Sequence, residues 1–243
     1  MADPQAALDR ALEEKNLVLV YQPIHDAKSG AIIAAEALLR QRRESGEIRE
    51  AGIITDAAED GPELFRLDSW IMRGACRDAA QWRNVRLNVN LSPREFEEEG
   101  DVSRLSSFCD PRRLNLEITE TSYIDSPEET VHILDALKQQ GIQLWLDDFG
   151  TGHSSLEHLR HFPLDGVKIA SQFIAGCITD RRCRTITKAI IALAHALELQ
   201  VIAEGVENQQ QLDFLRDEGC EAVQGFLFSR PMELDDFLRL LRL

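Results

Sequence analysis

Short apolar runs recur along the chain and predict strands that alternate with helices. Several of the runs are apolar almost throughout, which is typical of parallel strands that helices cover from outside. They are rich in leucine and β-branched residues. Eight strands are expected, at residues 17–24, 32–39, 85–92, 113–120, 142–148, 166–170, 199–205 and 221–228.

Helical patterns lie between most of these strands. The segment "SPEETVHILDALKQQG" begins with Ser126 as N-cap and Pro127 at the first helical position. Glu129 completes a capping box, and Gly141 ends the helix. Two further helices are expected, within residues 179–199 and 207–219. The first of these repeats apolar residues on one face, at Ile186, Ala189, Ile190, Leu193, Ala194 and Leu197.

Eight strands in this alternation predict a closed α/β barrel. The length of 243 residues fits such a barrel, whose usual size is about 250 residues. The first two strands are joined by "HDAKSGA", which suits a hairpin and is too short for a crossover helix. We therefore expect a modified TIM (β/α)8 barrel with one antiparallel strand near the N-terminus. No linker divides the chain, so residues 1–243 are expected to form a single domain.

Composition and charge narrow the function classes. No apolar run approaches the roughly 20 residues of a membrane span, and the N-terminus lacks the apolar core of a secretory signal, so a cytoplasmic location is expected. The net charge of −15 argues against a DNA-binding protein, because such proteins gain affinity from a basic surface. A phosphate ligand would need local cations, either a few basic side chains or bound metal ions.

Cysteine and histidine do not indicate a zinc site. The five cysteines are scattered without a Cys-x-x-Cys pair, which favours buried free thiols over disulfides or zinc ligands. His153, His158 and His161 lie close in sequence, but their spacing fits no strong zinc signature. We interpret them as surface or helix-face residues.

Polar residues recur at the ends of the expected strands. In a barrel of this kind, functional groups collect at the C-terminal ends of the strands. An isolated carboxylate buried there is unfavourable unless it is paired or bound to a metal. The residues concerned are Gln22, Glu36, Asn90, Glu117, Glu120, Asp147, Asp148, Lys168, Glu204 and Gln224.

The carboxylates of this set, together with one amide ligand, offer oxygen atoms, which favour Mg²⁺ or Mn²⁺ over zinc. Adjacent Asp147 and Asp148 could serve two ions about 4 Å apart, the arrangement with which two-metal hydrolases generate hydroxide and stabilise phosphate oxygens. Alternatively, one aspartate caps the following turn and the other faces solvent. Lys168 could stabilise hydroxide with a depressed pKa among cations, or merely offset nearby carboxylates.

Eight motifs in order resemble the EAL-domain family of cyclic di-GMP phosphodiesterases. The resemblance extends from about Leu8 to Leu241. It implies a modified barrel that hydrolyses cyclic di-GMP to linear 5'-pGpG with two Mg²⁺ or Mn²⁺ ions. The motifs are "YQPI" (21–24), "EALLR" (36–40), "NVNLS" (88–92), "EITE" (117–120), "DDFGTGHSSL" (147–156), "VKI" (167–169), "AEGVE" (203–207) and "QGFLFSRP" (224–231).

The resemblance also implies roles for single residues. Catalysis is expected to depend on Lys168, Glu204 and Glu36, with Lys168 positioning or deprotonating the water. The ligands expected for the first metal are Glu36, Asn90, Glu117 and Asp147, and those for the second are Asp147, Asp148 and Glu204. Substrate contacts are expected from Gln22, Leu38, Arg40 and Gln224. Glu120 and Glu207 are expected to support the metal ligands, and the loop of Gly150, Thr151 and Gly152 is expected to connect the site with a homodimer interface.

One departure divides the functional hypotheses. Ala170 in "VKIAS" stands where the family commonly has an aspartate, and its absence is expected to weaken metal binding or slow the reaction. The first hypothesis is an active phosphodiesterase, possessing every expected metal ligand. The second is an EAL domain that binds cyclic di-GMP without hydrolysing it, as a receptor. A third, outside the family, is a Mg²⁺-dependent barrel lyase or aldolase. A sensory or cyclase domain is expected outside this chain.

Overall fold

The structure is a computed structural model that describes residues 16–51, 62–90, 108–119, 127–151 and 155–242. One sheet has the strand order β1-β9-β8-β7-β6-β5-β4-β2-β3, and β1 also pairs with β2, which closes eight of these strands into a barrel. The strands are β1 (Leu17–Asp26), β2 (Ile32–Arg42), β3 (Ile48–Glu50), β4 (Arg86–Asn90), β5 (Leu114–Thr119), β6 (Gln143–Phe149), β7 (Gly166–Ile169), β8 (Gln200–Ala203) and β9 (Ala222–Val223).

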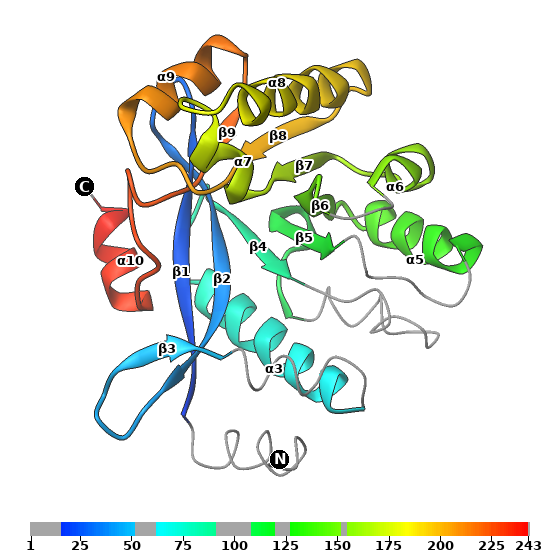
Figure 1. Cartoon of the computed structure of the whole chain (residues 1–243). Helices are drawn as coiled ribbons and strands as arrows, with labels where there is room; N and C mark the ends of the chain where they lie inside the picture. Colours follow the sequence, from blue (N-terminus) through cyan, green and yellow to red (C-terminus); the bar gives the residue numbers. More distant parts are fainter. Residues whose placement is uncertain (1–15, 52–61, 91–107, 120–126, 152–154, 243) are drawn as a thin grey trace, which may run out of the picture.

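Helices lie outside the barrel (Figure 1). They are α3 (Pro62–Ala79), α5 (Pro127–Gln139), α6 (Ser155–His161), α7 (Ser171–Gly176), α8 (Arg181–Ala196), α9 (Gln209–Asp217) and α10 (Leu234–Leu240), with the 3-10 turn η2 (Pro111–Arg113) before β5. The predicted barrel is therefore confirmed. None of the helices in the described ranges combines the length and apolar character that a membrane span requires.

The predicted antiparallel strand is β1. It runs antiparallel to both of its neighbours, β2 and β9, whereas β2, β4, β5, β6, β7, β8 and β9 pair in parallel around the rest of the barrel. Because β1 is reversed, its C-terminal end lies at the opposite end of the barrel from the C-terminal ends of the seven parallel strands. Gln22, expected near a strand end, is instead in the middle of β1, directly opposite Glu36 of β2.

The eighth expected strand, 221–228, is much shorter than predicted. Pairing in β9 stops at Val223, and Gln224 leads into an irregular segment whose backbone bonds to Val206. Val206 N donates to Gln224 O over 3.0 Å, and Leu227 N donates to Val206 O over 2.9 Å. Gly225 packs so closely on the Val206 backbone that a Cβ atom would clash there. The short strand β3, which pairs with β2, was not predicted.

The predicted helices are present with shorter bounds. The first begins at Pro127, as expected, while Ser126 lies outside the described residues. In α9, Asn208 and Gln211 form a reciprocal capping box. The apolar face predicted for α8 is partly wrong, because Ile186 and Leu197 are 40% and 44% exposed. The buried row instead includes Thr187, whose hydroxyl donates to the Cys183 carbonyl and so allows burial of a polar residue.

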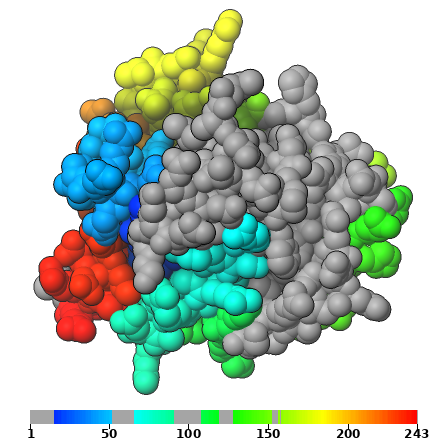
Figure 2. All heavy atoms as spheres, turned by 90° about the horizontal axis from the view of Figure 1, so that it is seen from below, coloured from blue at the N-terminus to red at the C-terminus, as the bar shows by residue number. Residues whose placement is uncertain are grey.

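Aromatic side chains close the side of the barrel between β1 and α10. Tyr21 is fully buried and donates its hydroxyl to Asp78 Oδ2 over 2.8 Å. Trp82 packs edge-on against both Tyr21 and Phe237 of α10, with ring centroids 5.3 and 5.0 Å apart. In the view from below in Figure 2, residues of α3, in cyan, and α10, in red, both reach the surface.

The cysteines are free thiols, as predicted. Cys76, Cys177 and Cys220 are buried, and Cys76 Sγ lies 2.8 Å from Cys109 Sγ. Two of the three clustered histidines are described. His158 is buried on α6 and stacks on Phe162, whereas His161 is exposed. His153 lies outside the described residues.

Candidate functional site

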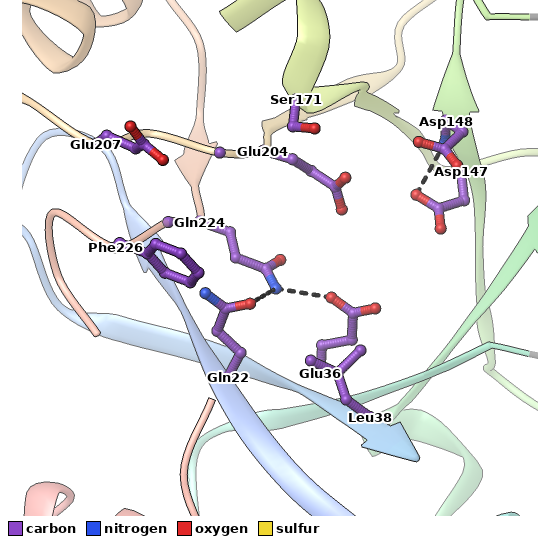
Figure 3. Close-up of a pocket in the computed structure, with 12 residues that line it drawn as sticks. Gln22, Glu36, Leu38, Asp147, Asp148, Ser171, Glu204, Glu207, Gln224 and Phe226 are labelled. Carbon is purple, nitrogen blue, oxygen red and sulfur yellow. Dashed lines mark hydrogen bonds between the residues drawn. The ribbon is translucent and has the colours of Figure 1, made fainter. Parts of the chain in front are cut away.

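A pocket of about 380 Å³ opens among the C-terminal ends of the parallel strands (Figure 3). Eight of the predicted site residues line it, from β1, β2, β6 and the segments after β8 and β9. They are Gln22, Glu36, Leu38, Asp147, Asp148, Glu204, Glu207 and Gln224. Ser171, Gly205, Gly225 and Phe226 also line the pocket and were not predicted.

Lys168 lies beneath this pocket among four carboxylates. Its Nζ is 2.6 Å from Glu204 Oε1 and 2.8 Å from Glu117 Oε2. It is also 3.1 Å from Asp147 Oδ1 and 3.5 Å from Glu36 Oε2. Lys168 and Glu117 are both fully buried, and Glu36 is nearly so. We call Glu36, Glu117 and Lys168 the inner cluster.

The charges of this cluster oppose the effect of burial. Burial lowers the pKa of Lys168. The negative charges of Asp147, Glu117, Glu204 and Glu36 raise this pKa by more than burial lowers it, so it lies well above the usual value. The depressed pKa expected from the sequence depends on neighbouring cations and stays a prediction. Burial and the charge of Glu36 raise the pKa of Glu117 well above its usual range.

Glu36 is held by two amides and one ammonium at once. Asn90 Nδ2 donates to Glu36 Oε1 over 3.0 Å, and Gln224 Nε2 donates to Glu36 Oε2 over 2.7 Å. Burial raises the pKa of Glu36, but Lys168 and these two amides outweigh burial and leave the pKa below its usual value. Gln224 Nε2 also donates to Gln22 Oε1 over 3.0 Å, so both predicted substrate amides belong to one network (Figure 3).

Asp147, Asp148 and Glu204 form a second acidic group at the edge of the pocket, which we call the outer triad. One oxygen from each lies within 4.8 Å of the others. Regular pairing of β6 with β7 shifts between Leu146 and Phe149, and Asp148 has a left-handed φ of 51°. At this irregularity the Asp147 side chain contacts Lys168, whereas Asp148 is exposed. Burial raises the pKa of Glu204 to about 7, against the opposing charge of Lys168.

The donor set fits divalent cations with oxygen ligands. Asp147, Asp148 and Glu204 already bring three oxygens together, and Asn90 adds an amide beside Glu36. Concentrated carboxylates of this kind need positive charge, and only one ammonium, that of Lys168, contacts four of them among the described residues. Mg²⁺ and Mn²⁺ prefer such hard oxygen ligands.

Three other predicted residues have no contact with the inner cluster among the described interactions. Arg40 donates to the Leu39 carbonyl and is 3.8 Å from Glu50 of β3. Glu207 lines the pocket but is exposed, on the side away from Asp147 (Figure 3). Thr151 folds back on Asp148, since its hydroxyl donates to the Asp148 carbonyl over 3.0 Å.

The remaining loop residues are only partly described. Gly150 has a φ of 96°, which favours glycine. A Cβ atom added there would also press on the Phe173 ring of α7. Glu120 and Gly152 lie outside the described residues, so their expected roles stay predictions.

Ala170 occupies the N-cap position of α7 and is 2% exposed. It follows β7 directly, two residues after Lys168, and no side chain caps the helix there. An acid at this position would face the same region as Lys168. The next residue, Ser171, reaches the pocket edge.

Asn88 and Phe226 are among the groups near the site that were not predicted from the sequence. Asn88 precedes Asn90 by two residues on one strand, so both point to the same side of the sheet, and this period of two could have identified it. Asn88 Nδ2 donates to Glu117 Oε1 over 2.6 Å. Phe226 is 48% exposed and lies under Arg230, whose Cζ is 4.1 Å from the ring centroid. Its position in the irregular segment after β9 gave no periodic signal.

The fold and the site define an α/β barrel whose mouth carries carboxylates suited to divalent cations. Residues 5–231 match the family described as the EAL domain, and the chain therefore belongs to the EAL domain family.

Two similar proteins are longer than this chain. Cyclic di-GMP phosphodiesterase NbdA of Pseudomonas aeruginosa is 38% identical over 248 residues, which cover 97% of this chain and 32% of NbdA. Signaling protein YkoW of Bacillus subtilis is 36% identical over 242 residues, which cover 96% of this chain and 30% of YkoW. The chain thus spans about a third of the length of these relatives.

A solved structure supports the same fold. The phosphodiesterase PaMucR, in a complex with c-di-GMP, superimposes with a TM-score of 0.88 at 34% sequence identity. The alignment covers 97% of this chain and 100% of the PaMucR chain.

Proposed function

We propose that this chain hydrolyses one phosphodiester bond of cyclic di-GMP to give linear 5'-pGpG, with two Mg²⁺ or Mn²⁺ ions. The observation that carries the proposal is the arrangement of four carboxylates around Lys168 at the mouth of an EAL-domain barrel. The names of NbdA and PaMucR supply the substrate, since both are called phosphodiesterases and both names or titles mention cyclic di-GMP.

In this proposal the two acidic groups hold one ion each and share Asp147. Glu36, Asn90, Glu117 and Asp147 would bind the first ion, and the outer triad would bind the second. When bound, the ions supply Lewis-acid stabilisation of phosphate oxygens. Lys168 Nζ, 2.6 Å from Glu204 Oε1, is placed to exchange a proton with that carboxylate and to stabilise negative charge on an attacking water.

Substrate would enter over the Gln22–Gln224 amide pair. Leu38 and Phe226 offer apolar surface for a base beside these amides. Arg40 could reach a phosphate oxygen by leaving the Leu39 carbonyl, because its contact with exposed Glu50 is long and weak.

The test is incubation of the purified chain with cyclic di-GMP and either Mn²⁺ or Mg²⁺, followed by chromatography. We expect pGpG with metal and none after chelation. Glu36→Ala should abolish product formation. Arg43→Ala is the control, because Arg43 is exposed and lies outside the pocket lining, and it should leave product formation unchanged. If the wild-type chain forms no pGpG with either Mn²⁺ or Mg²⁺, the proposed phosphodiesterase activity is refuted.

Ala170 favours a second candidate function, a receptor that binds cyclic di-GMP without hydrolysis. Ala170 stands at the N-cap of α7, two residues after Lys168, where the resemblance to the family leads us to expect an aspartate. Calorimetry with cyclic di-GMP distinguishes the two candidates, because a receptor gives a binding signal without pGpG.

Assembly and cellular context are part of the same proposal. We expect a homodimer in the cytoplasm, with a sensory or cyclase domain outside this chain, since the relatives are about three times longer. Sedimentation of the purified chain, with and without cyclic di-GMP, measures the oligomeric state.

A further inference from the structure

A series of side-chain hydrogen bonds crosses the barrel interior from its N-terminal end to the base of the pocket. Arg86 Nε donates to Asn115 Oδ1 over 2.6 Å, and Asn115 Nδ2 donates to Asn88 Oδ1 over 2.8 Å. Asn88 Nδ2 then donates to Glu117 Oε1 over 2.6 Å. The other oxygen of Glu117 accepts from Lys168 over 2.8 Å. We call Arg86, Asn115 and Asn88 the amide relay.

The strand register explains why these side chains meet. Arg86 and Asn88 lie two residues apart on β4, and Asn115 and Glu117 lie two residues apart on β5, so each pair points to one side of the sheet. The two strands are parallel neighbours, with Asn88 opposite Asn115. The relay therefore rises along the barrel interior toward the inner cluster.

Arginine fixes the direction of every bond in the relay. A guanidinium can only donate hydrogen bonds, so Asn115 must turn its oxygen toward Arg86 and its amino group toward Asn88. Asn88 must then accept with its oxygen and donate to Glu117. Arg86 is itself anchored, because it donates to the carbonyls of Arg112 and Leu114.

Because the relay is buried, breaking one of its hydrogen bonds is energetically unfavourable. Asn88 and Glu117 are fully buried and Asn115 is 3% exposed, so water does not replace a lost partner easily. With Glu117 Oε1 held by Asn88, Oε2 is the oxygen that faces Lys168 and the predicted first metal. The relay thus selects one orientation of the carboxylate.

We propose that Asn88 and Asn115 are positioning residues for the metal site. They act through Glu117, by holding its carboxylate ready for a divalent cation before the cation arrives. This inference rests on the proposed function only for the identity of Glu117 as a ligand. Groups that orient metal ligands typically change metal affinity by about 10- to 100-fold when removed.

The test is Mn²⁺ binding to the full chain by calorimetry, without substrate. Asn88→Leu should weaken Mn²⁺ binding about 10- to 100-fold. Asn115→Leu should weaken it less, since Asn88 remains, and adding it to Asn88→Leu should have no further effect, because Asn115 acts only through Asn88. Asn88→Ser, which keeps a donor, should bind Mn²⁺ better than Asn88→Leu.

Gln143→Leu is the matched control. Gln143 lies opposite Asn115 in the β5–β6 register but outside the relay, so its loss should leave Mn²⁺ affinity unchanged. Circular dichroism verifies that each variant folds, and Asn115→Leu or Asn88→Ser serves if Asn88→Leu does not.

Folded relay variants with wild-type Mn²⁺ affinity would overturn the inference, as would fully additive effects of the two leucine substitutions. A wild-type chain that binds Mn²⁺ but releases no pGpG would refute only the proposed function, and the predicted loss of Mn²⁺ binding in the variants would still support the relay.

Discussion

Glu117 and Asp148 belong to neighbouring strands and point to the same end of the barrel, yet their surroundings differ. Glu117 is fully buried, and Asn88 and Lys168 each bond to one of its oxygens. Asp148 is exposed and lies where β6 leaves regular pairing. The inner cluster is therefore ordered by the protein itself, whereas the outer triad leaves more of its organisation to a bound cation.

The largest expected effect comes from removing the only ammonium in the inner cluster. Lys168→Ala should slow pGpG release about a thousand-fold. It should also destabilise the fold by about 3–5 kcal/mol, because it leaves buried carboxylates without their partner. Chromatographic assays and urea unfolding measure the two effects.

Lys188→Ala is the control for this comparison. Its side chain is 49% exposed and pairs with Glu218 on the surface, so its removal should cost less than about 1 kcal/mol and leave turnover unchanged. Equal losses of stability in the two lysine variants would contradict the contrast between buried and exposed pairs.

The next effect is a pH dependence of stability in the outer triad. Burial holds the pKa of Glu204 at about 7 in the fold, above the ordinary 4.5. This carboxyl stabilises the fold fully below about pH 4.5, and its contribution is lost as the pH rises through about 7. Glu204→Gln does not ionise, so the variant should gain up to about 3 kcal/mol over the wild type between pH 4.5 and 8.

Urea unfolding with a chelator present gives both free energies across this range. A difference between Glu204→Gln and the wild type that does not change with pH would show that burial of Glu204 does not control its ionisation.

A smaller effect is expected at Ala170, where the site lacks an acid. Ala170→Asp should lower the Mn²⁺ concentration for half-maximal turnover about tenfold, by adding a carboxylate two residues after Lys168. Ala170→Asn has nearly the same shape and can also cap α7, but it carries no charge. If both variants respond alike, the cap rather than the charge is responsible.

The smallest effect is expected for the stability of an Asp148 variant. Asp148→Asn should change the free energy of unfolding by less than about 0.5 kcal/mol without metal, because the residue is exposed and asparagine tolerates a positive φ. Thermal unfolding measures this change. A large loss would show that Asp148 supports the fold as Glu117 does.

Periodicity and motif order predicted the barrel and most residues of the pocket. Parallel strands carry apolar runs and place polar residues at one end, so Glu36, Asp147 and Glu204 could be located before the structure was known. The antiparallel strand followed from a short connection between the first two strands.

The predictions that were wrong or incomplete depend on tertiary contacts, which the pattern of residue types along the chain does not show. Strand 221–228 was too long because close packing of Gly225 on Val206 turns the chain away from the sheet. Asn88 and Asn115 were missed because their importance lies in a pairing across two strands, 27 residues apart. Which face of α8 is buried depends on its packing against the rest of the fold, and the helical repeat of apolar residues alone does not determine this face.

The two neighbours of β1 pair with it to different extents. Nine residue pairs join β1 to β2, but only two, His25–Val223 and Asp26–Ala222, join β1 to β9. Beyond them, backbone bonds join Ala27 to Glu221 and Tyr21 to Met232. Side chains also join the two sides, since Gln224 donates to Gln22, which donates to the Ser229 carbonyl. The β1–β9 seam, which has as few strand pairs as the β8–β9 seam, therefore depends partly on these amides beside the pocket. A ligand that bonds to them would also hold the two sides of the seam together.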